Sequence, residues 1–174
     1  MKMALYSSGV EYGLHCLLFL VDDSKGESRE ANARTLAELQ GVPAELLAKV
    51  FTKLAKAKLL EATSGPRGGF KLARPADEIT VLDVVKAIDG DKAIFECRNI
   101  RENCALFGNC TPDWAVADTC SVHAVMQAAQ QRMEEALAQQ TLLDIARRVK
   151  RKAPADYGQR IDVWFEENKG EKGS

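Results

Sequence analysis

Several features that would place this chain in a common class are missing. The formal net charge of its 174 residues is −1, so the whole chain is not a polybasic nucleic-acid binder. No apolar run approaches the length of a membrane-spanning helix, and polar residues follow Met1 at once. We therefore expect no signal peptide, no membrane contact and a cytoplasmic location. No internal repeat is present either, which leaves a domain of ordinary size or a small domain with an oligomerisation arm.

The charge that is present is distributed unevenly. Basic residues outnumber acidic ones between Val42 and Pro75, where only Glu45 and Glu61 oppose them. The basic residues of this segment are Lys49, Lys53, Lys56, Lys58, Arg67, Lys71 and Arg74. Such a local excess attracts phosphates, although a solvated helix face explains scattered lysines equally well.

The same segment has the pattern of a helix-turn-helix. Thr35-Leu-Ala-Glu38 has the spacing of a capping box and predicts a short helix that ends at Gly41. Pro43 suits the first turn of a second helix. Apolar residues at helical spacing define its buried face, namely Leu46, Leu47, Val50, Phe51, Leu54 and Ala55. Two helices joined at a glycine-containing turn form this motif.

A hairpin is expected directly after the second helix. Residues 61–64 and 70–74 flank Gly65-Pro-Arg-Gly-Gly69, whose glycines and proline favour a tight turn. This hairpin would be the wing of a winged helix. Thr80 and Thr141 each start a further capping pattern, and apolar spacing from Ser121 onward predicts a helix of about five turns.

DNA readout requires an exposed helix start near base edges and cations near phosphates. Arg67 stands between glycines at the expected wing tip, where it could enter a minor groove. The candidate DNA-binding residues are Thr35, Ala44, Glu45, Lys49, Lys53, Lys56, Arg67, Gly68 and Gly69.

Four cysteines lie close together after the expected winged helix. Their pattern is Cys97-x6-Cys104-x5-Cys110-x9-Cys120, followed by x2-His123. Structural zinc sites favour paired Cys-x2–4-Cys knuckles, which are missing, whereas wide spacing on a loop suits iron–sulfur ligation. Free thiols, or a disulfide formed on oxidation, remain the alternative. A Cys120–His123 nucleophile would make the chain an enzyme, but no orienting residue or oxyanion-hole motif accompanies it, so we expect no enzyme.

In this arrangement the chain resembles the winged-helix transcriptional regulators that include the iron–sulfur sensors IscR, NsrR and RsrR. The resemblance runs from about Met3 to Ile145. It rests on residues 7–14, 36–39, 47–54, 65–70 and 79–85, together with Cys97, Cys120 at a helix start, and Thr141-Leu-Leu-Asp144. The stretch Val10-Glu-Tyr-Gly-Leu-His-Cys16 is most similar to RsrR-like members, although Gln40 stands where those members have a histidine.

The resemblance implies a homodimer, crossed by the helix after Cys120, that binds a palindromic operator in double-stranded DNA. It also implies a cluster, more often 2Fe–2S than 4Fe–4S, on Cys97, on Cys120 and on Cys104 or Cys110. Because the family usually offers three cysteines here, the fourth could be a ligand or a spare thiol. Further ligands implied by the resemblance are Glu11, supplied by the partner subunit, and His123.

The expected protein is mainly α-helical, with a winged helix-turn-helix in residues 1–90 and a cysteine-bearing loop in residues 91–120. A dimerisation helix and a following helix would occupy residues 121–150, and a partly flexible extension residues 151–174. The expected function is transcriptional regulation in which a cluster that senses redox state, nitric oxide or iron supply controls operator affinity. The alternative is a regulator without a cluster that uses a disulfide switch or zinc.

Overall fold

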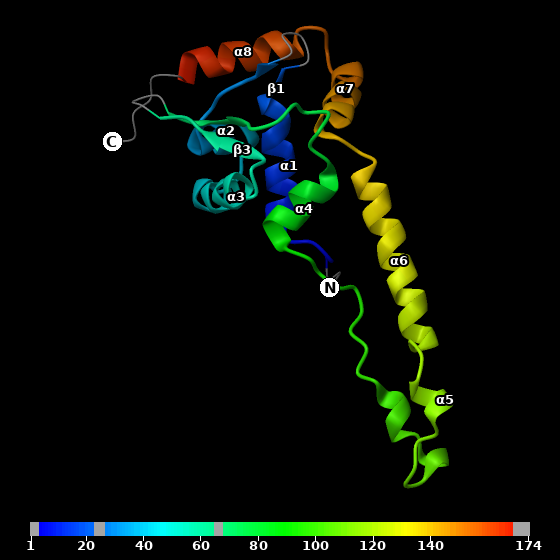
Figure 1. Ribbon diagram of the computed structural model, residues 1–174. Coiled ribbons are helices and arrows are strands. Elements are labelled where there is room, and N and C mark those ends of the chain that lie inside the picture. The colour runs from blue at the N-terminus through cyan, green and yellow to red at the C-terminus, as the bar shows by residue number, and fades with distance from the viewer. Residues whose placement is uncertain (1–3, 23–26, 65–67, 169–174) are drawn as a thin grey trace. The chain divides into compact units, whose positions relative to one another are not determined.

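The computed structural model describes residues 4–22, 27–64 and 68–168. The chain forms two compact units (Figure 1). Unit 1 contains the chain up to Gly90 and from Leu137 onward, and unit 2 contains Asp91–Ala136. In the described chain, none of the helices combines the length and apolar composition needed to cross a membrane.

Unit 1 is mainly helical and has two small antiparallel sheets. Its elements are α1 (Ser8–Leu20), β1 (Val21–Asp22), β2 (Glu27–Ser28), α2 (Ala33–Gln40), α3 (Ala44–Lys56), β3 (Leu60–Ala62), β4 (Phe70–Leu72), α4 (Val81–Asp89), α7 (Leu142–Lys152) and α8 (Tyr157–Asn168). Val21 pairs with Ser28 in the first sheet, and Leu60 pairs with Leu72 in the second. The order α2, α3, β3, β4 is that of a winged helix-turn-helix, which confirms the predicted fold class.

The helix starts show how far local patterns determine the boundaries. Thr80 and Thr141 both form capping boxes, with Asp83 and Asp144 respectively, as the sequence predicts. The prediction for α2 was wrong by about a turn, because the Asn32 side chain, not Thr35, caps the helix. Asn32 Oδ1 accepts the Thr35 backbone N–H at 2.7 Å.

The core of unit 1 lies where α1, α3 and α4 pack together. Leu47, Val50, Phe51 and Leu54 of α3 are all buried, as the helical spacing predicts. Gly13 lets α1 approach closely, since a Cβ there would lie 2.7 Å from Ile88 Cδ1 and 3.1 Å from Val50 Cγ1. The α3 helix is therefore fixed against α1 and α4.

Cys16 belongs to this core and not to a site. It is fully buried on α1, and burial raises the pKa of its thiol to about 12. The thiol therefore stays protonated at neutral pH, and Cys16 acts as a small core residue.

Unit 2 contains the cysteine segment and most of the longest helix. Its elements are the 3-10 turns η1 (Ile100–Asn103) and η2 (Ala105–Phe107), the short helix α5 (Asp113–Val116) and α6 (Ser121–Ala138), which ends in unit 1. The segment expected to be an irregular loop thus contains three helical turns. Every residue of α6 is described, and none of them is buried.

Two other segments differ from the sequence analysis. The strands β1 and β2 were not predicted from the sequence. The helix α8 was not predicted, and its Phe165 is buried in the core of unit 1. Residues 169–174, the end of the extension that was expected to be partly flexible, lie outside the described residues.

Candidate functional site

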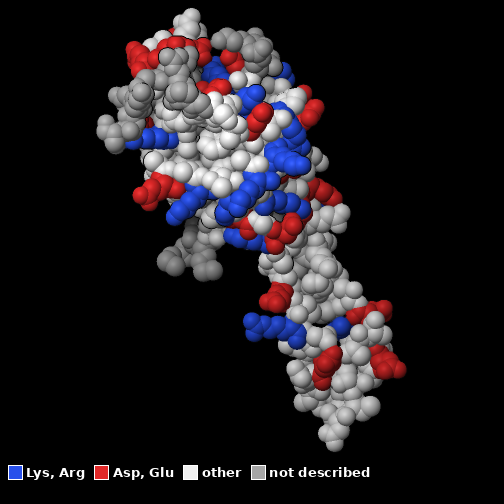
Figure 2. Space-filling model, turned by 60° about the vertical axis from the view of Figure 1, so that its left-hand side comes forward, with Lys and Arg blue, Asp and Glu red and all other residues white. Residues whose placement is uncertain are grey.

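The first candidate site is the exposed face of α3. Ala44, Glu45 and Lys49 are exposed in the first half of this helix, and Lys56 is exposed in its last turn. Because the opposite face of α3 is buried, these side chains can approach a ligand without disturbing the core. Figure 2 shows Lys and Arg side chains gathered on the side of unit 1 where α3 lies.

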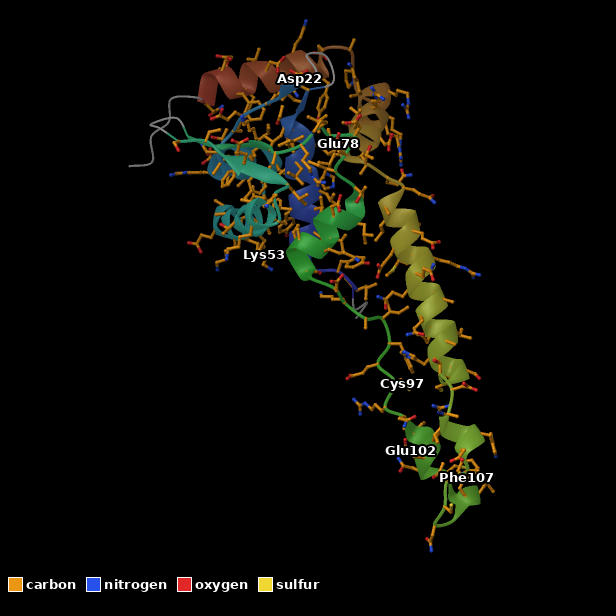
Figure 3. The ribbon with its side chains drawn as sticks, viewed as in Figure 1. Asp22, Lys53, Glu78, Cys97, Glu102 and Phe107 are labelled. Carbon is orange, nitrogen blue, oxygen red and sulfur yellow. The ribbon has the colours of Figure 1, made fainter. Side chains whose placement is uncertain are left out.

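Lys53 has a different environment from its neighbours on α3. Its Nζ donates a hydrogen bond of 2.6 Å to the backbone carbonyl of Ile88, in the last turn of α4 (Figure 3). Cations stabilise the carbonyl end of a helix, so this contact joins α3 to the end of α4. Thr35, the remaining candidate on these helices, is half-buried at the start of α2.

The wing contacts the segment before α2 at Gly69 and Phe70. Gly69 is buried, and a Cβ there would lie 2.7 Å from the carbonyl carbon of Ala31. The next residue, Phe70, exchanges backbone hydrogen bonds of 2.8 and 3.1 Å with Ala31. Gly69, with half-buried Gly68 before it, therefore lies at the base of the wing. Arg67 lies outside the described residues.

The second candidate site lies in unit 2, where Cys97 and Cys120 come together. Cys120 precedes α6, and the backbone N–H groups of His123 and Val122 donate to its sulfur, which lowers the pKa of this thiol. The positive charge of Arg101 and a hydrogen bond from the Cys97 thiol lower it further. A helix start thus stabilises a thiolate at Cys120.

The other two cysteines are not joined to this pair. Cys104 is half-buried between η1 and η2, and Cys110 is exposed. Among the described residues, no three His, Cys, Asp or Glu side chains are close enough to hold a metal ion. Two of the four predicted thiol ligands are therefore together.

His123 lies next to the cysteine pair, and one of its ring nitrogens has no hydrogen-bond partner among the described residues. The ring is 5.9 Å from that of Phe95, and its buried Nδ1 has no hydrogen-bond partner in the described part of the protein. The buried Nε of Arg101 also lacks a partner there. Buried polar atoms are normally paired. These two orphaned atoms beside a stabilised thiolate fit a site that another group completes, although the complete ligand set is not assembled.

Glu11, the ligand expected from a partner subunit, is exposed on α1 of unit 1. His15 is also exposed and lies one helical turn further along α1. Both line a cavity of about 550 Å³ near the start of α1. The spacing of four residues places both side chains on one face of α1.

The lowered pKa of the Cys120 thiol predicts how its reactivity depends on pH. The nucleophile in alkylation is the thiolate, so a lowered pKa should move the rise in reaction rate to lower pH. We expect Cys120 of reduced, metal-free protein to react with iodoacetamide with a midpoint below that of free cysteine measured under the same conditions. Mass spectrometry of the modified peptides at a series of pH values measures this midpoint, and unlabelled Cys16 is the internal control. A Cys120 midpoint at or above that of free cysteine would contradict the hydrogen-bonded geometry.

Comparisons with known proteins agree with the winged-helix fold. NsrR of Oceanobacillus iheyensis is 32% identical over 102 residues, which are 58% of this chain and 68% of that protein. IscR of Cereibacter sphaeroides is 36% identical over 80 residues, 44% of this chain and 52% of that protein. The structure of T. potens IscR superposes with a TM-score of 0.60 at 20% identity, over 88% of this chain and 92% of the other, which supports the fold.

The family assignment covers most of the chain. Residues 6–148 match the Rrf2 family, described as iron-dependent transcriptional regulators. The match includes α1 to α4, the wing and all four clustered cysteines, and it ends within α7. The chain therefore belongs to the Rrf2 family and is a DNA-binding transcriptional regulator, not an enzyme.

Proposed function

We propose that the affinity of this regulator for its operator is controlled by an iron–sulfur cluster held in unit 2. The observation that carries the proposal is the meeting of Cys97 and Cys120 at the start of α6, where backbone N–H groups stabilise a thiolate. Thiolates are the usual ligands of iron–sulfur clusters. The names of the relatives NsrR and IscR, and the description of the family as iron-dependent, support the same interpretation.

Cys97 and Cys120 would hold the cluster, with Cys104 or Cys110 as a third thiolate. His123 of the same chain, or Glu11 of a partner subunit, would complete the site, and His15 next to Glu11 is a further candidate from that subunit. A bound cluster, proposed to be of the 2Fe–2S type, would supply a one-electron centre sensitive to oxidants, nitric oxide and iron supply. The protein contributes the Cys120 thiol, whose pKa is lowered, and the positive charge of Arg101 beside it.

The proposal includes a homodimer, and α6 supports it. Val122 and Val125 are 61% and 68% exposed, and Met126, Ala129 and Met133 follow at helical spacing. A helix with an apolar stripe and no buried residue needs a partner surface. A second copy of α6 would cover this stripe and would give a twofold molecule suited to a palindromic operator.

Metal analysis of protein purified without oxygen tests the cluster. We expect iron and acid-labile sulfide together with visible charge-transfer absorbance, and operator binding that changes when the cluster is oxidised or removed. A colourless preparation that binds zinc, or one that switches only by forming a disulfide, would instead support a regulator without a cluster. An iron-free preparation that binds its operator identically under all redox conditions would exclude both the cluster and the disulfide switch.

The DNA interface gives a separate prediction on Lys49. If the Lys49 ammonium contacts a phosphate, Lys49→Ala should lower the slope of log K against log salt concentration by about one. The slope is measured by fluorescence anisotropy with an operator selected from genomic fragments, where we expect two chains per site. Lys152→Ala, which removes an exposed lysine at the end of α7, is the matched control. Equal slopes in the two variants would place the phosphate contacts elsewhere.

A further inference from the structure

Unit 1 contains a second cavity, and His15 is the one candidate cluster ligand among the described residues that line it. It has a volume of about 800 Å³ and lies between α1, α7 and α8, with Asp22 and Arg29 also in its wall. This volume is within the range of small-molecule sites. Tyr157, Gly158, Ile161 and Asp162 of α8 line it, and all four follow residue 148, where the family match ends. The cavity therefore depends on a helix outside the matched segment.

Most of the cavity wall is apolar or aromatic. Its apolar and aromatic side chains include Leu18 and Phe19 of α1, Ile145 and Val149 of α7, and Tyr157 and Ile161 of α8. Each of the three helices contributes two of these side chains. Such a wall favours a ligand with a large apolar body.

The charged groups of the cavity are concentrated around Arg29. Its Nε donates to Asp162 Oδ1 at 2.9 Å, and its Nη2 lies 3.6 Å from Asp22 Oδ2. Its Nη1 donates to the Val21 carbonyl at 2.6 Å. The side chains of Asp22 and Arg29 are 4% and 15% exposed, and that of Asp162 is 46% exposed. Figure 3 shows Asp22 close to α8.

This part of the cavity has more negative than positive charge, because one guanidinium lies between two carboxylates. Two carboxylates would repel an anionic ligand group here. A cationic group would be attracted by Asp162, whose side chain is more exposed than those of Asp22 and Arg29. Lys150, the other charged residue of the lining, is exposed near the end of α7. The charges therefore favour a ligand whose positive group lies beside Asp162.

We propose that this cavity is a binding site for a small organic cation, with an aromatic or aliphatic body against α1 and α7 and its charge beside Asp162. Gln40, the last residue of α2, also lines the cavity. Because Gly41 follows it with a left-handed φ of 71° and leads to α3, the ligand would lie next to the helix-turn-helix. The site would give the regulator an input independent of its cysteines.

Binding of rhodamine 6G, a flat aromatic monocation, to the full-length protein tests the proposal by fluorescence anisotropy. We expect saturable binding of one dye per chain, at least tenfold tighter than that of the anion 8-anilinonaphthalene-1-sulfonate. Gly158→Trp should abolish it, since a Cβ at Gly158 meets no atom within 4 Å and the indole would occupy the cavity. Val163→Trp, on the same helix but outside the lining, should bind the dye normally.

Asp162→Asn tests the charge of the site with little change in its shape. The substitution removes one negative charge and keeps an oxygen for Arg29, so we expect about fivefold weaker binding of rhodamine 6G and no weakening for the anionic dye. It also tests the site if Gly158→Trp fails to fold, as judged by circular dichroism. Absence of saturable binding, equal binding by the Gly158 and Val163 variants, or tighter binding of the anionic dye would overturn the proposal.

Discussion

Cys97→Ala and Cys120→Ala are each expected to give a protein without iron, without sulfide and without visible absorbance. Each substitution removes one of the two sulfurs that meet at the start of α6, and the ligands that remain do not complete the proposed set. Absorbance spectra and metal analysis of anaerobically purified variants measure the loss. Since the winged helix lies in unit 1, both variants should retain a normal melting transition for that unit.

Cys16→Ala is the matched control for these variants, because Cys16 is a buried core residue of unit 1. We expect it to retain the iron and the spectrum of the unmodified protein. Cys104→Ala compared with Cys110→Ala should identify the third thiolate ligand. Retention of a full complement of iron by Cys97→Ala or Cys120→Ala would refute the proposed ligand pair.

Phe51→Ala is expected to lower the free energy of unfolding of unit 1 by about 3–5 kcal/mol. Phe51 is fully buried on α3, and its ring meets that of Phe70 edge-on, with 5.3 Å between the centroids. The substitution leaves a cavity between the recognition helix and the wing. Operator binding should therefore weaken even at temperatures where the variant is still folded. Urea denaturation followed by circular dichroism measures the stability, and anaerobic anisotropy titration measures the DNA affinity.

Phe51→Leu provides the comparison, since it retains an apolar side chain but loses the contact between the two rings. We expect a smaller loss of stability than for alanine. If Phe51→Ala were as stable as Lys49→Ala, a substitution on the exposed face of the same helix, the described packing of α3 would be wrong.

The parts of the fold that depend on neighbouring residues could be predicted from the sequence. The capping boxes at Thr80 and Thr141 use side chains three residues away, so the pattern is complete within one turn. The cap at Asn32 was not predicted, because the capping-box spacing that begins at Thr35 indicated a later helix start. The strands β1 and β2 have two residues each, which is too short for any alternation to appear. The helix α8 buries only Phe165, so its sequence lacks a strong apolar periodicity.

The candidate sites were predictable to a smaller extent. The resemblance singled out Cys97 and Cys120, but the spacing of the cysteines could not show that these two thiols meet while Cys104 and Cys110 remain apart. The environment of Lys53 depends on the carbonyl of Ile88, 35 residues further along the chain. The cavity beside α8 likewise depends on the distant pairing of Arg29 with Asp162. Such arrangements result from tertiary packing, which local sequence patterns do not contain.

Each end of α4 lies next to a point where the chain passes between the two units. At its start, the Val81 N–H donates to the Gln140 carbonyl at 2.8 Å, just after α6. At its other end, Ser7 donates to Asp89, Lys53 donates to Ile88, and Gly90 leads into unit 2. If a cluster alters operator affinity through α4, thermodynamic reciprocity requires that the operator alters the cluster's reduction potential or iron affinity to the same extent. Regulator molecules bound to a promoter would then differ in reduction potential or iron affinity from those free in the cell. The two populations would respond to different levels of oxidant or iron.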